Sequence, residues 1–398
     1  MDFEFTEAEK RFREEVENFA RKELPPDWND KAYYWPACYG MTPISESEFE
    51  PFCNQFLRKL GKKGWLSLGW PKEYGGMDSM MKQAIVDDVM SYNRAPNGNI
   101  ATMIGGPTII HCGSEEMKKE WLHRIAGGEV SFFLGYSEPD AGSDLASLRT
   151  SAVEDGDELI INGQKIWSTG AHVSDYAWLI ARTDPSVPKH KGISLMIVDC
   201  RSEGVTIQPL MNICGVHSFN EVFFDNVRVS KKNIVGEMNK GFYYLMVALE
   251  YERLVIGIGA FRRVLDELIY YVKETKYNGE SLSKDPKVRN KLASMAIDIE
   301  VLYGMYWRAA WMMDRGQIPE LEASVIKLVG TEKSRTFANA AMDILGPYGQ
   351  LDKGSKWAPL NGKICLGYLD SISGAIGAGT SEIMRTVIAT RGLGLPRE

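Results

Sequence analysis

The stretch that decides the fold reads Tyr136-Ser-Glu-Pro-Asp-Ala-Gly-Ser-Asp144. Pro139, Gly142 and two aspartates within nine residues are too many turn-forming residues for a helix, so the pattern predicts a loop. Such a loop presents backbone N–H groups and the short hydroxyls of Ser137 and Ser143. Those groups suit a ligand that is rich in phosphate or carbonyl oxygens.

A second stretch, Lys165-Ile-Trp-Ser-Thr-Gly170, follows at the end of a strand-like segment. The Trp167 indole can lie against a flat ring while the hydroxyls of Ser168 and Thr169 bond the polar edge of that ring. Taken alone, each stretch fits a ligand-free loop or strand end equally well. In this order and at this spacing, the two resemble the flavin-binding core of the acyl-CoA dehydrogenase family. The resemblance implies an FAD enzyme that desaturates acyl-CoA thioesters.

The composition narrows the class of protein. A length of 398 residues predicts two or three packed units. The hydrophobic content of 44% and charged content of 25% are ordinary for a soluble globular protein. A net charge of −7 without a dense run of lysine or arginine argues against nucleic-acid binding. No apolar run reaches the roughly 18 residues of a membrane span, so no membrane association is expected.

The cysteines and histidines point to a cytoplasmic protein without a metal. The six cysteines include no Cys-x-x-Cys pair, which indicates reduced thiols. The acidic start, Met1-Asp-Phe-Glu, lacks the basic and apolar regions of a secretory signal. The five histidines show no metal-ligand spacing, so each is interpreted as structural.

The first part of the chain is expected to be helical. Thr6-Glu-Ala-Glu9 is a capping-box pattern, and apolar residues follow it at helical spacing. Residues 52–64 and 115–125 are further expected helices. An aromatic-rich insertion from Trp28 to about Ser45 fits a packed surface loop better than the lining of a substrate entrance, and both interpretations stay open.

After residue 130 the chain changes to short β-branched or aromatic runs separated by turn formers such as Asp155-Gly156. Strands at this spacing, without helices between them, predict an antiparallel barrel or sandwich. From Gly241 onward, apolar residues recur at three- and four-residue steps, which predicts helices that pack as a bundle. The expected strands are 158–162, 177–182, 193–199 and 221–225, and the expected helices are 241–276, 285–315, 319–345 and 380–390.

These expectations describe a mainly α fold with a central β domain, which is also the architecture that the resemblance implies. We predict an N-terminal helical domain at residues 1–130 and a middle antiparallel β-barrel domain at 131–235. A C-terminal four-helix bundle is predicted at 236–398.

No Gly-x-Gly-x-x-Gly follows a strand and no Gly-x-x-x-x-Gly-Lys-Ser/Thr is present, so neither a Rossmann site nor a P-loop is supported. The resemblance implies a different flavin site, which the two stretches quoted above help to form. Gly377-Ala-Gly-Thr-Ser-Glu-Ile-Met-Arg385 matches the closing motif of the family. Asp343-Ile-Leu-Gly-Pro-Tyr-Gly349 matches a stretch that approaches FAD from a neighbouring subunit. The residues implied to bind FAD are Tyr136, Ser137, Gly142, Ser143, Trp167, Ser168, Thr169, Gly346, Thr380 and Glu382.

The reaction needs a base, because removal of a proton α to a thioester is difficult in water. Many family members carry a glutamate immediately before the Gly-Thr of the closing motif, where this chain has Ala378. In a minority typified by isovaleryl-CoA dehydrogenase, the glutamate lies in the first bundle helix and an arginine follows it. Glu252 and Arg253 match that arrangement, so Glu252 is the expected catalytic base.

Helical periodicity by itself does not choose between Glu252 and Glu250, since both lie on largely apolar faces. Burial on either face would raise the pKa of the carboxylate, which suits a base. A buried ion pair with Arg262 or Arg308 is the structural alternative.

The acyl-CoA substrate is implied to contact Ser143, Arg253, Ala378 and Gly379. Ala378 retains the backbone N–H that, in the family, bonds the thioester oxygen together with a ribityl hydroxyl of FAD. Gly105-Gly106 and Ala378 remove side-chain volume where a ring could lie, and the alternative base position accompanies bulky acyl groups in relatives. We therefore expect a branched, cyclic or aromatic acyl group, in β-oxidation or in the degradation of fatty or aromatic acids.

One stretch departs from the family. The common Arg-x-x-Phe-Gly, whose arginine helps to hold the FAD pyrophosphate, is replaced by Lys273-Glu-Thr-Lys-Tyr-Asn-Gly279. Lys276 offers a charge there without bidentate geometry. The main prediction is a homotetramer that passes electrons to an electron-transferring flavoprotein. The alternatives are an FAD-binding subunit of a heteromer, and an oxidase or monooxygenase that uses oxygen.

Overall fold

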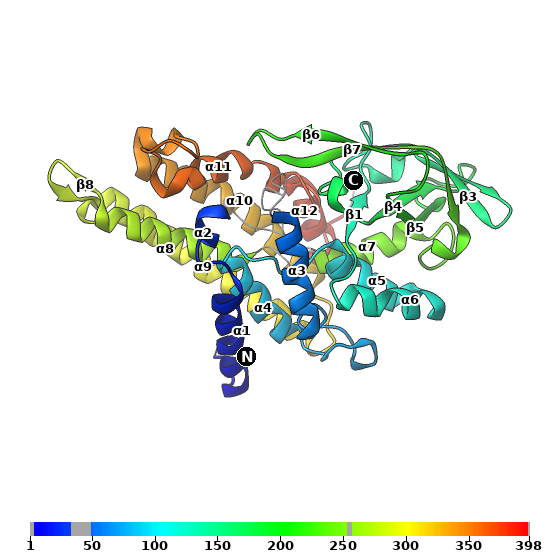
Figure 1. Ribbon diagram of the computed structural model, residues 1–398, viewed down its shortest axis with the longest axis horizontal. Coiled ribbons are helices and arrows are strands. Elements are labelled where there is room, and N and C mark those ends of the chain that lie inside the picture. Colours follow the sequence, from blue (N-terminus) through cyan, green and yellow to red (C-terminus); the bar gives the residue numbers. More distant parts are fainter. Residues whose placement is uncertain (1–3, 33–48, 253–256, 397–398) are drawn as a thin grey trace. The chain divides into compact units, whose positions relative to one another are not determined.

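The structure is a computed structural model that divides into two compact units (Figure 1). The described part of the chain comprises residues 4–32, 49–252 and 257–396. The first unit, called here the sheet unit, comprises Pro43–Asp78 and Gly98–Glu252. The second, called here the helical unit, comprises Met1–Thr42, Ser79–Asn97 and Arg253–Glu398.

The sheet unit is built on seven strands in the order β1-β4-β2-β3-β7-β6, with β5 also bonded to β4. The two ends of this order, β1 and β6, do not pair with each other, so the described strands form a half-barrel. The strands are β1 Phe132–Gly135, β2 Ser151–Asp155, β3 Glu158–Lys165, β4 Tyr176–Arg182, β5 Ile193–Asp199, β6 Val205–Met211 and β7 His217–Ser230.

All four predicted strand segments are confirmed, within β3, β4, β5 and β7. The antiparallel expectation holds for four pairs, β2–β3, β3–β7, β4–β5 and β6–β7. β1 and β4 are parallel, and β2 meets β4 in parallel at one residue pair. Parallel neighbours need a long connection, and the β2–β3 hairpin lies in the chain between β1 and β4.

Both faces of β4 and β5 are covered. Because side chains alternate along a strand, Leu179 of β4 joins one buried cluster while its neighbours Trp178 and Ile180 join another. The second cluster also contains Trp121 of the helix α6 and Leu245 of the helix α7. The helices of this unit are α3 Phe49–Lys62, the π-helix η2 Ala101–Gly105, α5 Gly106–Cys112, α6 Glu115–Ala126 and α7 Gly241–Glu252.

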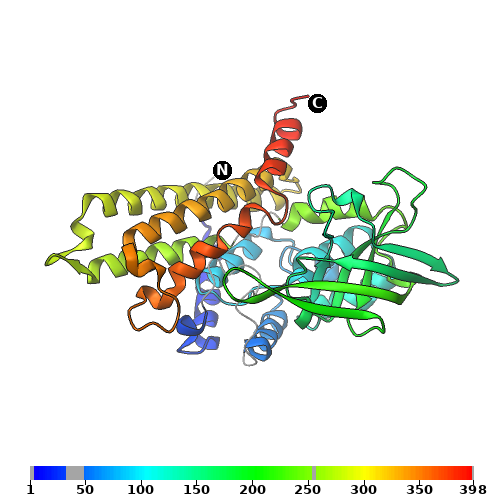
Figure 2. The same ribbon diagram turned by 90° about the horizontal axis from the view of Figure 1, so that it is seen from above.

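The helical unit contains three long helices, α8, α9 and α10, which lie alongside one another (Figure 2). Their shared core includes Phe261, Ile299 and Phe337, one from each helix, all nearly or fully buried. The helices of the unit are α1 Glu7–Glu23, α2 Trp28–Lys31, α4 Met80–Tyr92, α8 Ile258–Glu274, α9 Pro286–Met313, α10 Glu320–Leu345, α11 Lys363–Asp370 and α12 Ser381–Val387.

Local capping explains where α1 begins. The Thr6 side chain accepts a bond from the Glu9 N–H at 3.3 Å, and the Glu9 carboxylate accepts one from the Thr6 N–H at 2.7 Å. The predicted capping box is therefore confirmed. The predicted helices at 52–64, 115–125, 285–315 and 319–345 are also confirmed, with ends that shift by a few residues.

The predicted single helix at 241–276 is wrong. The α7 helix ends at Glu252, and α8 begins at Ile258 after Gly257, which has φ 61° and ψ 48°. Glycine adopts this left-handed conformation without the penalty that a Cβ atom brings, so it can separate two helices. Lys276 belongs instead to a two-stranded hairpin of β8 (Lys276–Tyr277) and β9 (Glu280–Ser281).

Short helical turns connect these elements. None of the helices in the described ranges is both long and apolar enough to cross a membrane. Cys112, Cys200 and Cys365 are free thiols. The short turns are η1 Lys72–Tyr74, η3 Leu145–Ser147, η4 Ala171–Val173, η5 Lys231–Asn233, η6 Leu282–Lys284, η7 Gly346–Gln350, η8 Pro359–Gly362, η9 Ser373–Ala375 and the π-helix η10 Ile388–Gly392.

Candidate active site

The stretch 136–144 leaves β1 as a loop without an α-helix, as its turn formers predict. Glu138 and Ala141 exchange two backbone hydrogen bonds of 3.0 and 3.1 Å across the turn that contains Pro139. Gly142 and Ser143 are exposed at the tip of this loop, whereas Tyr136 is buried at its base. The tip of the loop therefore exposes backbone groups and the Ser143 hydroxyl to solvent, while its base at Tyr136 is buried.

The stretch that ends β3 lies directly beside this loop, because the Ile166 N–H donates to the Ser137 carbonyl at 2.9 Å. Trp167 has φ 59°, a conformation that a bulky residue seldom adopts, and its side chain is 57% exposed. Backbone strain of this kind is concentrated at binding sites. The structure thus brings the predicted cofactor residues 136–143 and 167–169 together within the sheet unit.

Asn220 of β7 holds the Trp-Ser-Thr segment in place, and the sequence interpretation missed it. Its fully buried side chain donates to the Ser168 carbonyl at 2.9 Å, and its own carbonyl accepts the Ser168 N–H at 3.1 Å. The amide also lies within hydrogen-bond distance of His172 and His217, whose rings stack at 3.8 Å. Burial, and then the nearby His217, lower the pKa of His172. Asn220 lies among other polar residues of β7, so the sequence offered no signal that singles it out.

The closing motif forms a turn in the helical unit. Ala378 has φ 53° and is exposed, and Gly379 has φ 92°. Within the described ranges, neither residue donates its N–H to another group of the chain. The Lys327 ammonium, on a residue that is 4% exposed, donates to the Gly379 carbonyl. The N–H groups of Ala378 and Gly379 therefore remain available to a ligand, while the Gly379 carbonyl is bonded to Lys327.

Thr380 and Glu382 lie at the start of α12. The Thr380 hydroxyl accepts the Ile383 N–H at 3.2 Å and so caps the helix, while Glu382 is exposed in its first turn. Gly346 caps the C-terminus of α10 with φ 60°. Its approach to the FAD of a neighbouring subunit stays a prediction.

The predicted base is the last residue of α7. The side chains of Glu252 and Glu250 lie outside the described part of the chain, as does all of Arg253. Most of the aromatic insertion, residues 33–48, also lies outside it. The choice between the two glutamates therefore remains a prediction.

The expectation that Gly105 and Gly106 leave room for an acyl ring is wrong. A Cβ atom on Gly106 would lie 2.0 Å from a ring atom of Trp70, and one on Gly105 would lie 2.8 Å from a ring atom of Phe132. These glycines allow aromatic side chains to pack against the backbone within the sheet-unit core. The space that they leave is already filled.

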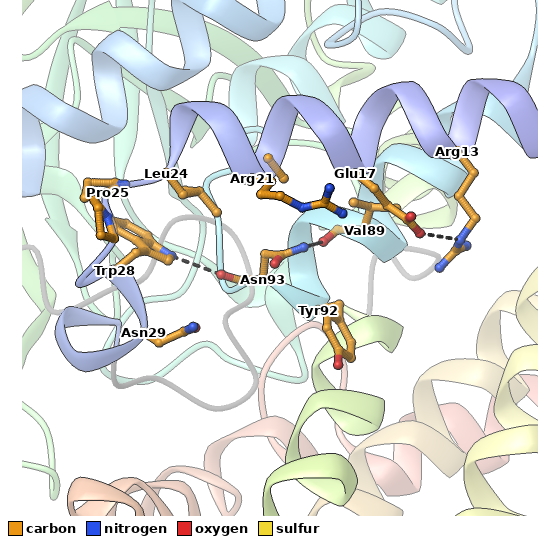
Figure 3. Close-up of a pocket in the computed structure, with 12 residues that line it drawn as sticks. Arg13, Glu17, Arg21, Leu24, Pro25, Trp28, Asn29, Val89, Tyr92 and Asn93 are labelled. Atoms are coloured by element: carbon orange, nitrogen blue, oxygen red, sulfur yellow. Dashed lines mark hydrogen bonds and ion pairs between the residues drawn. The ribbon is translucent and has the colours of Figure 1, made fainter.

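A cavity of about 450 Å³ lies in the helical unit between α1, α2 and α4 and contains none of the predicted site residues (Figure 3). The Trp28 indole N–H donates to the Asn93 carbonyl at 3.0 Å, and the Asn93 amide donates to the Val89 carbonyl at 2.8 Å. Arg13 donates to Glu17 at 3.1 Å. Several of its polar groups thus bond within the protein, and we do not regard the cavity as the reaction site.

Three family models match the chain in succession: acyl-CoA dehydrogenase N-terminal domain at residues 6–129, middle domain at 134–227 and C-terminal domain at 239–393. The acyl-CoA dehydrogenase FadE29 of Mycobacterium tuberculosis is 32% identical over 404 residues, covering 100% of this chain and 99% of the relative. The chain belongs to the acyl-CoA dehydrogenase family. It is an oxidoreductase with the fold of that family.

Two further relatives of this dehydrogenase are informative. The caffeyl-CoA reductase-Etf complex subunit CarC of Acetobacterium woodii is 31% identical, over 97% of this chain and 98% of the relative. The solved structure described as Tcur3481-Tcur3483 steroid ACAD is 33% identical with a TM-score of 0.89, and each chain is covered completely. The fold class predicted from the sequence is confirmed by these matches.

Enzymes of this family are FAD flavoproteins, and the residues present fit that cofactor. The Ser168 hydroxyl is buried and has no hydrogen-bond partner in the described ranges. The adjacent Trp167 indole is exposed and offers an apolar face. On the loop 136–144, no atom of the described residues, apart from Gly142 and its chain neighbours, lies within 4 Å of the position that a Cβ atom on Gly142 would take. An unsatisfied buried hydroxyl beside an exposed ring is expected where a planar, polar-edged ligand binds.

Proposed function

We propose that this dehydrogenase removes the α-proton of a bulky acyl-CoA with Glu252 and forms the 2-enoyl-CoA. The observation that carries the proposal is Ala378, since the residue immediately before Gly379-Thr380 has no group that accepts a proton. A base must then come from another element, and Glu252 at the end of α7 is the carboxylate that the family resemblance offers. Bound FAD supplies the acceptor for the hydride that leaves the β-carbon.

The backbone at the closing motif supports removal of the α-proton. The N–H groups of Ala378 and Gly379 are unused within the described ranges, and such donors stabilise the charge that develops on a thioester oxygen. We assign FAD binding to Tyr136, Ser137, Gly142, Ser143, Trp167, Ser168, Thr169, Thr380 and Glu382, and to Gly346 of a second copy. Ser143 is assigned to the CoA portion of the substrate, and Arg253 is assigned to substrate binding.

The base assignment is tested by Glu252→Gln, with Glu250→Gln as the matched control. Anaerobic mixing with substrate should no longer bleach the flavin of Glu252→Gln, while FAD content stays normal. Loss of a general base typically lowers the rate by about 10² to 10⁴. Bleaching that is lost in Glu250→Gln and kept in Glu252→Gln would contradict the assignment. Activity regained by adding Ala378→Glu to Glu252→Gln would support an α-carbon that both positions can reach.

A ring-bearing or branched acyl group is the proposed substrate class. One relative is named for caffeyl-CoA and another for a steroid, and Ala378 leaves the side-chain position at the closing motif small. A panel of straight, 2-branched, alicyclic and aromatic acyl-CoAs should give the highest kcat/KM for one of the last three classes. Differences of one or two methylenes change binding by about 1–3 kcal/mol, so the preference should be graded. Equal kcat/KM across the panel would contradict the proposal.

Electron-transferring flavoprotein is the proposed acceptor, with a homotetramer as the main assembly. One relative is named as a subunit of a complex with Etf, and another structure is described by a pair of gene products, so a heteromer is the second candidate. Light scattering of the purified chain separates the two assemblies, because a heteromer subunit should not form a stable FAD-loaded tetramer alone. Rapid reduction of oxygen by the substrate-reduced enzyme would instead favour an oxidase.

A further inference from the structure

A buried ion pair lies between the two segments that we assign to the flavin. Lys165 is fully buried at the last position of β3, and Glu138 is 9% exposed in the loop after β1. The Lys165 ammonium donates to the Glu138 carboxylate at 2.9 Å and to the Tyr136 carbonyl at 3.0 Å. The two contacts join the end of β3 to the start of the loop.

The same carboxylate also holds the far end of the loop. Its oxygens accept the N–H groups of Arg149 and Thr150 at 2.6 and 2.8 Å, immediately before β2 begins at Ser151. Glu138 therefore brings residues 136–138 and 149–150 together, and the exposed tip at Gly142 and Ser143 lies between them. One carboxylate thus closes the loop, and one ammonium attaches it to the strand that carries Trp167.

The charges of the pair follow from its surroundings. Burial alone would raise the pKa of Glu138, but the Lys165 ammonium and the bonds from Thr150 and Arg149 lower it below its usual value. Burial lowers the pKa of Lys165 to about 8, although Glu138 opposes this shift. Both groups are therefore charged at neutral pH. A buried ion pair stabilises a fold little compared with apolar residues, so stability alone does not explain the pair.

We propose that Glu138 and Lys165 are positioning residues that hold the loop 136–150 and the Trp167-Ser168-Thr169 segment in the arrangement that binds the flavin. This inference rests on the flavin site proposed above. Both side chains bond the backbone at the two ends of the loop, so the pair acts through Tyr136, Thr150 and the strand end. If the loop adopts its binding arrangement in only a tenth of molecules, the apparent Kd for FAD rises tenfold.

Two further contacts also attach the loop to the rest of the sheet unit. The Arg182 guanidinium donates to the Ala146 carbonyl at 2.6 Å, and Lys189 donates to Asp144 at 2.7 Å. If these contacts alone ordered the loop, loss of the buried pair would leave FAD binding unchanged. The matched control is Arg228→Met, which removes an exposed cation that bonds Glu158 at 2.7 Å at the opposite end of β3.

The experiment compares Lys165→Met, Glu138→Gln and the double variant with Arg228→Met and the parent enzyme. FAD titration of each apoprotein gives the Kd, and hydrogen exchange of the apoproteins follows peptides from 137–150 and from β5. Far-UV circular dichroism checks folding. Lys165→Met is expected to bind FAD at least tenfold more weakly than Arg228→Met, with faster exchange in 137–150 and unchanged protection of β5.

The double variant separates positioning from the cost of a lone buried charge. If the pair positions the loop, the double variant stays as weak in FAD binding as Lys165→Met; recovery to the affinity of the parent enzyme would overturn the inference. FAD binding by Lys165→Met within twofold of Arg228→Met, or unchanged exchange in 137–150, would also overturn it. If Lys165→Met does not fold, Glu138→Gln decides by the same criteria. Failure of the parent enzyme to bind FAD would instead reject the proposed flavin site, and the exchange comparison would still test the loop contacts.

Discussion

Replacing Asp87 with asparagine is expected to stabilise the helical unit at neutral and alkaline pH. Asp87 is 8% exposed on α4, and its carboxylate accepts one long bond of 3.4 Å from the Gln83 amide. Burial raises the pKa of Asp87 to about 7, with a further contribution from the neighbouring Asp88. Asparagine keeps the acceptor oxygen and removes the charge, so the packing of the helix should not change.

The size and sign of the effect follow from proton linkage. Between the unfolded pKa of 3.8 and the folded pKa of about 7, the folded protein binds the additional proton, so stability falls as the pH rises through this window. Above pH 7 the full cost is present. At 1.36 kcal/mol for each pKa unit it amounts to about 4 kcal/mol, which Asp87→Asn should recover. Below pH 3.8 both states are protonated and the substitution should have little effect.

Apparent Tm values at pH 4 and pH 8 measure the difference, and the neighbouring carboxylate provides the control. Asp88 accepts a hydrogen bond from the Tyr303 hydroxyl at 2.5 Å and forms an ion pair with Arg13 at 2.7 Å. Burial raises the pKa of Asp88 but these two partners oppose the shift, so Asp88→Asn should stabilise the protein at pH 8 less than Asp87→Asn does. For a cooperative unit of about 200 residues, each kcal/mol shifts Tm by roughly 2–4 °C. An equal shift of Asp87→Asn at both pH values, or a lower Tm at pH 8, would refute the assignment of a buried, destabilising charge.

Three further outcomes are expected. Gly106→Ala should lower the apparent Tm, since its Cβ would lie 2.0 Å from a Trp70 ring atom and overpacking typically costs about 1–3 kcal/mol; Gly142→Ala, with open space, should leave Tm unchanged. Burial would raise the pKa of Glu267, but Arg94 and Arg263 lower it to about 2. About 3 kcal/mol of stability should therefore be lost as the pH falls from 4.5 to 2, and acid titration followed by ellipticity would detect this loss. Trp167→Ala should weaken FAD binding by about tenfold in an equilibrium titration, because an aromatic contact contributes about 0.5–1.5 kcal/mol beyond the area that it buries.

Features that depend on neighbouring residues were predictable from the sequence. The capping box at Thr6 needs only a hydroxyl and a glutamate three residues later, and both bonds are present. The runs within β4 and β5 are apolar because both of their faces are covered, so strand character was visible without knowledge of the partner strands. The loop 136–144 was likewise determined by its own proline and glycine.

Features that depend on distant residues were not predictable in this way. Gly105 and Gly106 suggested an open space, but the aromatic rings that fill it come from Phe132 and Trp70. Asn220 lies 52 residues from the Ser168 carbonyl that it bonds, and no local pattern connects them. Gly257 adopts a left-handed conformation before α8, inside an apolar pattern where periodicity alone predicts that the helix continues.

The buried charged residues of the sheet unit also depend on partners that are distant in the sequence. Leu159, Ile161 and Lys165 are all buried along β3, so a lysine occupies a position that the strand pattern reserves for an apolar side chain. A buried ammonium requires an anionic partner, but the strand does not identify it; Glu138 becomes that partner only after the loop folds back. The stretches 136–144 and 165–170 thus contain Glu138 and Lys165, but only the folded structure shows that the two side chains meet.

Ala378 separates the roles of backbone and side chain at the closing motif. An alanine at φ 53° costs about 1 kcal/mol or more relative to a right-handed conformation, and the glutamate common at this position in the family is absent. The methyl side chain of Ala378 offers no chemistry that would account for this strain. The turn leaves the Ala378 and Gly379 N–H groups without partners within the described ranges, and the buried Lys327 ammonium bonds the adjoining carbonyl. We therefore propose that the turn serves its N–H groups, which would polarise the thioester whichever helix supplies the base.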